Sequence, residues 1–149
     1  MTTPGEPSGA DAQRRPLTHD ERVALLGRPL VGILSTVNAA AWVHSVPVFY
    51  LYRDGEIRIL CGVDSVKARN ARRTGRATFC VEVTEADRRF VTVMARARVE
   101  QPVLPADLHR LDEQYGRTDF SSGWDAGEFE GAAMLILTPV RWIAWADWD

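Results

Sequence analysis

Hydrophobic and polar residues alternate with a period of two along much of the chain. Such alternation predicts β-strands with one buried face, and largely apolar runs of similar length predict strands buried on both faces. Six segments fit these patterns, the sixth being bent at a proline: residues 30–37, 42–52, 56–63, 77–83, 90–100 and 132–146. Asp54-Gly55 lies between the second and third segments, and this dipeptide is typical of a two-residue hairpin. The chain is therefore predicted to be mainly β and antiparallel.

Three segments between these strands have the start and stop signals of helices. Thr18 and Glu21 form a capping box that opens a short helix ending at Gly27. Asp64 and Ser65 are good N-cap residues, and Gly75 is a natural left-handed stop, which predicts a helix of about two turns. A third helix is expected from Pro105 to Gly116. Residues 119–130 have weak periodicity and are expected to form a loop with about one helical turn.

Composition predicts one globular domain. The chain has 149 residues, of which 46% are hydrophobic and 26% charged, enough for a single core. Residues 1–16 are rich in Pro and Gly, so we expect a disordered tail followed by a domain over residues 17–149. The net charge of −2 gives no reason to expect binding to nucleic acid or membrane. No apolar run approaches 18 residues, and Cys61 and Cys80 are expected to be reduced thiols, so we expect a cytoplasmic protein.

The second predicted helix carries the chemistry that stands out, which is anion binding. Free backbone N–H groups at its start, the Ser65 hydroxyl and the Lys67 ammonium can converge on one point, as they do where proteins hold phosphate. Four arginines follow at spacings that put them on one helical face: Arg69, Arg72, Arg73 and Arg76. Charge and spacing alone favour an ordinary solvated face over an anion site.

The order of elements resembles a known superfamily. A hydrophobic strand, a strand containing Val46-Pro47-Val48, the Asp-Gly hairpin and a third strand precede the run Ser65-Val66-Lys67-Ala68-Arg69-Asn70-Ala71-Arg72-Arg73. This order resembles the pyridoxamine 5′-phosphate oxidase-like superfamily of flavin-binding split β-barrels. The Lys-x-Arg-Asn-x-Arg-Arg run is most similar to its actinobacterial branch of flavin/deazaflavin oxidoreductases that use coenzyme F420. The resemblance covers residues 17–145.

The resemblance implies a fold and a cofactor site. It implies a six-stranded antiparallel split β-barrel with short flanking helices, assembled as a homodimer with each cofactor between two subunits. Ser65 and Lys67 would hold the cofactor phosphate, Asn70 would fix the turn or the cofactor, and Arg69 is a weaker candidate. In the family the tricyclic ring lies near the second strand, so Val46, Pro47 and Val48 are candidates for the floor under the ring. A proline tolerated at a sheet edge explains Pro47 equally well.

Other residues give weaker signals. His44 is more typical of a structural histidine than of an acid or base, and the histidine spacings predict no metal site. Four of the five tryptophans fall near the C-terminus, namely Trp124, Trp142, Trp145 and Trp148. Such a concentration suits an oligomer interface or a pocket for a flat ring, and interface packing is our expectation for Trp142 and Trp145.

The leading functional hypothesis is an F420-dependent oxidoreductase that transfers a hydride between the deazaflavin and a small organic substrate. The cofactor carries that chemistry, which explains why the sequence reveals no catalytic residues. An FMN-dependent oxidase or flavin reductase is the nearest alternative, because FMN presents a phosphate to the same residues. A non-catalytic protein that binds flavin, deazaflavin or haem is a second alternative. Nucleic-acid binding is weaker, since no stacking aromatics are interleaved with the arginines.

Overall fold

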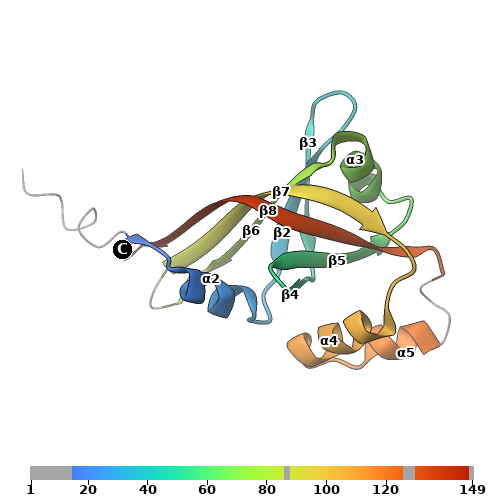
Figure 1. The fold of residues 1–149 in the computed structure, drawn as a ribbon. Coiled ribbons are helices and arrows are strands. Elements are labelled where there is room, and N and C mark those ends of the chain that lie inside the picture. Colours follow the sequence, from blue (N-terminus) through green and yellow to red (C-terminus); the bar gives the residue numbers. More distant parts are fainter. Residues whose placement is uncertain (1–14, 86–87, 126–129, 148–149) are drawn as a thin grey trace, which may run out of the picture.

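The strands form one strongly curled antiparallel sheet, seen in Figure 1 as a half-barrel in the computed structural model. The structure describes residues 15–85, 88–125 and 130–147. The order of the strands across the sheet is β3-β2-β6-β7-β8-β5-β4, and β1 pairs with β8. The strands are β1 (Arg15–Pro16), β2 (Gly32–Val37), β3 (Val43–Val48), β4 (Leu51–Arg53), β5 (Glu56–Gly62), β6 (Arg76–Val83), β7 (Arg88–Glu100) and β8 (Ala132–Asp147). The predicted class, a mainly β split barrel, is confirmed.

The count of six strands is corrected to eight in the described residues, chiefly because the segment 42–52 is divided. Its first half, β3, pairs with β2 at one edge of the sheet, and its second half, β4, pairs with β5 at the other edge. Between them the Tyr50 N–H donates to the Tyr115 hydroxyl at 3.1 Å, and Gln114 Nε2 donates to the Tyr50 carbonyl at 2.9 Å. These two side chains satisfy the backbone N–H and carbonyl of Tyr50 in place of a neighbouring strand. The chain can therefore leave β3 at one edge of the sheet and begin β4 at the other. The predicted Asp54-Gly55 hairpin does join β4 to β5.

The longest pair of strands, β7 and β8, gives the sheet its curl. The register shifts between Met94 and Ala95, which lie opposite Arg141 and Pro139 respectively. One strand therefore has an extra residue, Val140, and a bulge of this kind bends a strand and increases its twist. The bend predicted at Pro139 lies at this bulge.

Within the described residues four helices flank the sheet: α2 (His19–Leu26), α3 (Val66–Thr74), α4 (Pro105–Tyr115) and α5 (Asp119–Asp125). The first three were predicted, with Thr18 and Ser65 as N-caps and left-handed glycines ending α3 and α4. The expectation of a loop from residue 119 is wrong for Asp119–Asp125, which form helix α5. Its first turn is capped by Asp112 of α4, whose carboxylate accepts hydrogen bonds from the Phe120 and Ser121 N–H groups at 2.9 and 3.0 Å. Burial would raise the pKa of Asp112, but a hydrogen bond from the Ser121 hydroxyl and these two N–H bonds outweigh it and hold the pKa below its usual range.

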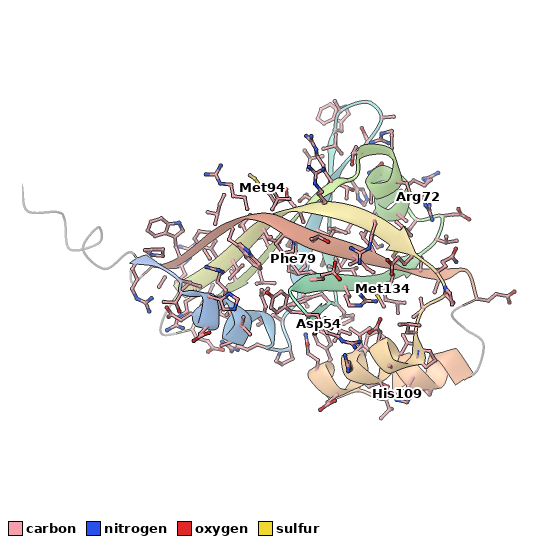
Figure 2. All side chains as sticks on the ribbon, in the orientation of Figure 1. Asp54, Arg72, Phe79, Met94, His109 and Met134 are labelled. Atoms are coloured by element: carbon pink, nitrogen blue, oxygen red, sulfur yellow. The ribbon has the colours of Figure 1, made fainter. Side chains whose placement is uncertain are left out.

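Apolar side chains gather on both faces of the sheet. The inner face holds the main core, which includes Phe79 and which α2 and α3 cover at its two ends. On the outer face α4 and α5 cover a second cluster with Met134 and Ile136 of β8. The rest of the outer face is open, and Figure 2 shows Met94 on it, across the sheet from Phe79. Helices thus cover only part of the outer face.

The expected disordered tail ends earlier than predicted. Arg15 and Pro16 form β1, opposite Ala146 and Trp145 of β8. The Arg15 guanidinium donates two hydrogen bonds to Glu21, at 2.7 and 2.8 Å, which with the Thr18 cap lowers the Glu21 pKa to about 2. Residues 15 and 16 are therefore part of the domain. The expectation for residues 1–14 lies outside the described residues.

Candidate functional site

The start of α3 has the geometry expected of an anion site. The Ser65 hydroxyl accepts a hydrogen bond from the Ala68 N–H at 3.4 Å, and the Ser65 N–H donates to the Gly62 carbonyl. The N–H groups of Val66 and Lys67 are left without an acceptor among the residues that the structure describes. Two free donors at the positive end of a helix dipole favour an anion there.

Lys67 adds a positive charge beside this helix start. Its side chain is half-buried, and it lies close enough to Cys61 at the end of β5 to affect that thiol. Burial raises the pKa of Cys61, while the charge of Lys67, the Ser65 side chain and the charge of Arg72 act in the opposite direction. Ser65 and Lys67 are thus brought together at the turn between β5 and α3, as predicted. Cys61 and Cys80 are both free thiols.

Asn70 holds α3 against the sheet. Its side chain is 3% exposed, and its amide nitrogen donates to the Thr36 hydroxyl of β2 at 3.1 Å. Its amide oxygen accepts a hydrogen bond from Arg73 at 3.2 Å. The side chain therefore positions the helix on β2, and its expected role at the turn or the cofactor stays a prediction. Thr36 could not be identified from the sequence, because no local pattern reveals a partner 34 residues away.

The four arginines do not share one helical face. Arg69 and Arg72 are exposed on α3, whereas Arg73 turns toward β2 and donates to the Val37 carbonyl. Arg76 is the first residue of β6, since Gly75 ends the helix with a left-handed conformation at φ 65°. The predicted basic face is therefore wrong for Arg73 and Arg76. Arg69 and Arg72 remain as cations on the exposed side of α3.

Val46, Pro47 and Val48 lie on β3, the edge strand next to β2. Val46 and Val48 are half-buried against the main core, and Pro47 is exposed on the opposite face of the strand. The three side chains therefore do not form one continuous floor. Pro47 is on an edge strand, where a missing N–H costs no ladder hydrogen bond.

His44 lies close to the contact between α3 and the sheet. It is directly opposite Thr36 in the β2–β3 register, and its Nδ1 is buried without a hydrogen-bond partner among the described residues. His44 was interpreted as structural from its sequence context. Buried polar atoms without a partner are uncommon in folded proteins, so this nitrogen is an exception in the described part of the chain.

The C-terminal tryptophans differ from one another in position. Trp142 is half-buried on the inner side, where its ring meets Tyr52 edge-on at 6.3 Å and Arg22 lies over it at 5.1 Å. Trp145 is half-buried opposite Phe90 of β7. Trp142 thus has partners within its own chain. Trp148 and the side chain of Trp124 lie outside the described residues.

A groove of about 680 Å³ lies on the open part of the outer face, beyond the C-terminal end of α3. It runs over β2, β6 and β7 to Val140 of β8, and its lining includes Thr36, Thr74 and Met94. No group of three metal-ligating side chains occurs in the described part of the chain, and no helix there is long and apolar enough to cross a membrane.

Solved structures share this fold. No protein-family model and no curated protein matches the chain. The conserved hypothetical protein Rv2991 from Mycobacterium tuberculosis is 25% identical, with a TM-score of 0.74 over 87% of this chain and 85% of that one. An F420 reductase is 16% identical, with a TM-score of 0.62 over 80% of this chain and 94% of its own. A protein from Listeria innocua named as a pyridoxamine 5′-phosphate oxidase is 18% identical, with a TM-score of 0.66 over 84% of this chain and 95% of that one.

The chain therefore has the split-barrel fold of the pyridoxamine 5′-phosphate oxidase-like proteins, as the order of its sequence elements predicted. The likeness to the F420 reductase, at 16% identity, shows the fold alone, and Rv2991 at 25% identity is described only as a conserved hypothetical protein. Structures with this fold also include the haem storage protein HutZ from Vibrio cholerae, 14% identical with a TM-score of 0.68 over 85% of this chain and 94% of that one. One fold thus holds proteins named for different ligands and functions.

Proposed function

We propose that this protein is an oxidoreductase that uses coenzyme F420 to reduce or oxidise a small organic substrate. The observation that carries the proposal is the start of α3, where two free N–H groups, the Ser65 cap and Lys67 meet. This arrangement suits the phosphate of a bound deazaflavin or flavin. One solved structure with this fold, 16% identical, is named as an F420 reductase, and this supports F420 as the first cofactor to test.

The residues of the chain fit a phosphate-bearing cofactor. Lys67 would pair with the phosphate, Ser65 would hold the first turn so that the free N–H groups face it, and Arg69 would add charge from the exposed side. Asn70 keeps α3 on β2, next to the edge strand with Val46, Pro47 and Val48, which remain our candidates for contact with the ring. The deazaflavin ring, when bound, supplies the hydride chemistry, so the protein need only bind, orient and exclude water.

FMN is the alternative cofactor, because its phosphate would use the same donors. A protein that binds a flavin, deazaflavin or haem without turnover is the other candidate, and the similarity to HutZ favours including haem in the test. Titration of the purified protein with F420, FMN and haem in turn ranks these possibilities. Turnover of F420 with a substrate panel then separates an enzyme from a carrier.

Lys67→Ala is expected to weaken F420 binding about tenfold to hundredfold. Loss of one charge-assisted hydrogen bond to a phosphate costs about 1.5–3 kcal/mol, which corresponds to that change in Kd. Arg72→Ala should have a smaller effect, because Arg72 is more than one turn beyond the helix start. Fluorescence titration gives Kd for both variants and the wild type.

Arg110→Ala is the matched control, since Arg110 is an exposed cation on α4, away from α3. It should leave the Kd for F420 unchanged, and thermal melts should show that all three variants are folded. Equal F420 affinity in Lys67→Ala and wild type would place the phosphate elsewhere. Failure of the wild type to bind F420 or FMN would favour the other candidates.

We further propose a homodimer that uses the outer face of β7. Met94 is 43% exposed there and Ile33 of β2 is 43% exposed, and apolar side chains that gather on one face commonly mark an interface. Light scattering at micromolar concentration should give twice the mass of one chain. Ile33→Lys should shift the mass toward that of one chain, while a wild-type monomer would contradict the proposal.

A further inference from the structure

The turn between β2 and β3 carries an exposed tryptophan. Trp42 is 75% exposed, and Val43 beside it is 65% exposed. The turn lies beyond Val37 and Val43, the last pair of the β2–β3 register, at the opposite end of β2 from Ile33 of the proposed homodimer face. Figure 1 shows the turn extending past the rest of the sheet, next to α3. A tryptophan that leaves most of its large apolar surface in water marks a surface that binds a partner.

Hydrogen bonds hold this turn in one shape. The Asn38 side-chain oxygen accepts from the Ala40 N–H at 3.0 Å and from the Trp42 N–H at 2.9 Å. The Asn38 N–H donates to the Trp42 carbonyl at 2.9 Å. Ala41 has φ 65°, which is uncommon for a residue other than glycine, so these bonds impose the conformation. Trp42 is thus presented on a fixed turn, and little conformational entropy is lost when it binds.

The charge around the turn is entirely positive. Residues 29–52 contain no Asp, Glu, Lys or Arg, and residues 65–81 contain no Asp or Glu but five cations: Lys67, Arg69, Arg72, Arg73 and Arg76. Arg73 donates to the Val37 carbonyl at the base of the turn, which fixes α3 beside it. Arg69 and Arg72 are exposed on α3, and Figure 2 labels Arg72 there. The net charge of −2 does not reveal this end of the molecule, because the acidic residues lie elsewhere.

We propose that this end of the molecule docks on an anionic lipid surface. Trp42 and Val43 insert at the level of the lipid headgroups, and Arg69 and Arg72 lie against the lipid phosphates. Tryptophan is favoured at the boundary between hydrocarbon and water, and basic residues are attracted by the negative potential of anionic lipids. An exposed apolar turn beside uncompensated cations matches both properties of such a surface. The inference does not depend on which cofactor the protein binds.

The test measures sedimentation of the full-length protein with two kinds of vesicle, one of phosphatidylcholine alone and one of phosphatidylcholine and phosphatidylglycerol in equal parts. Partitioning onto the anionic vesicles should be stronger by about tenfold or more, because several basic residues face the surface. High salt should weaken it, because salt screens exposed charges. No cofactor is added, so failure of the proposed function would not affect the result.

Two variants test the residues directly. Trp42→Ser should weaken partitioning onto anionic vesicles about tenfold, because it removes the inserted ring. Arg72→Gln should weaken it about fivefold, the change expected for one basic residue near an anionic surface. The matched controls are Leu104→Ser and Arg110→Gln, which change a 51% exposed apolar side chain and an exposed cation at α4, away from the turn. Both controls should partition like the wild type, and thermal melts should show that all four variants are folded.

Insertion of the ring is tested by fluorescence. Brominated lipids should quench part of the tryptophan emission of the wild type, and Trp42→Phe should sediment with the vesicles but lose that quenching. The proposal is overturned if the wild type does not sediment with anionic vesicles, or sediments equally with both kinds. Equal losses in the variants and in the controls would also overturn it. A loss of dimer mass in Trp42→Ser, without lipid binding by the wild type, would assign the turn to a second copy of the chain.

Discussion

Gly32→Ala is expected to destabilise the protein by about 3 kcal/mol or more, a large share of the 5–15 kcal/mol typical of a domain. A Cβ at position 32 would lie 2.2 Å from Cε2 and Cζ of Phe79, well inside van der Waals contact. The Phe79 ring is fully buried and meets the Tyr50 ring edge-on at 4.8 Å, so it cannot move aside without disturbing the core. Urea denaturation should show a lower midpoint with little change in slope.

Gly27→Ala is the control for this substitution. Its Cβ would meet its nearest neighbour, the Val23 carbonyl oxygen, at 3.5 Å, which is ordinary contact. The Phe79→Leu background tests the cause, because a smaller side chain removes the clash. Gly32→Ala should cost less there than in the wild type, which gives a favourable coupling energy in a double-mutant cycle. Equal stability of Gly32→Ala and Gly27→Ala would mean that β2 can shift away from β6.

Local signals explain which parts of the fold could be predicted from the sequence. The inner faces of β5, β6 and β7 follow from their period of two, because each strand has one face in the core. Helix starts at Thr18 and Ser65 and stops at Gly75 and Gly116 depend on one or two side chains close in sequence. Such features need no knowledge of distant partners.

The parts that were wrong depend on distant partners. Residues 49–50 leave the sheet because Gln114 and Tyr115 satisfy the Tyr50 backbone from 64 and 65 residues away. Helix α5 forms although its periodicity is weak, because Asp112 caps it from the preceding helix. A pattern within one segment contains no information about either contact. The observed strand and helix boundaries therefore differ from the predicted ones where a tertiary hydrogen bond takes the place of a local one.

In the candidate site, too, local features could be predicted from the sequence and features that depend on distant contacts could not. The Ser65 cap and the nearby Lys67 could be predicted, because both act within one helical turn. Spacing alone could not foretell that Asn70 would be engaged by Thr36. The stop at Gly75 was predicted, but Arg76, which was grouped with the helical arginines, moves to the first position of β6. That move puts Arg76 beside Arg96, a pairing set by the register of β6 and β7. The groove could therefore not be predicted without knowledge of the strand pairing.

Asp107→Ala is expected to destabilise the protein by about 2–4 kcal/mol. Asp107 of α4 is fully buried, and its carboxylate accepts hydrogen bonds from Arg58 at 2.9 and 3.1 Å and from Arg53 at 3.2 Å. Removing one partner of a buried ion pair costs about 3–5 kcal/mol because the other charge stays desolvated. Arg53 is 36% exposed and can regain water, so the expected cost is about 1 kcal/mol below that range.

Glu113→Ala is the matched control, since Glu113 is exposed on the same helix and should change stability by less than about 0.5 kcal/mol. Urea midpoints of both variants and of Asp107→Asn should rank Asp107→Ala lowest, because the amide keeps a hydrogen-bond acceptor. The loss should also reach Tyr50, whose N–H depends on Tyr115 at the other end of α4. Hydrogen exchange at Tyr50 should therefore accelerate in Asp107→Ala and stay unchanged in Glu113→Ala. Unchanged exchange together with a wild-type midpoint would mean that apolar packing alone holds α4 on the sheet.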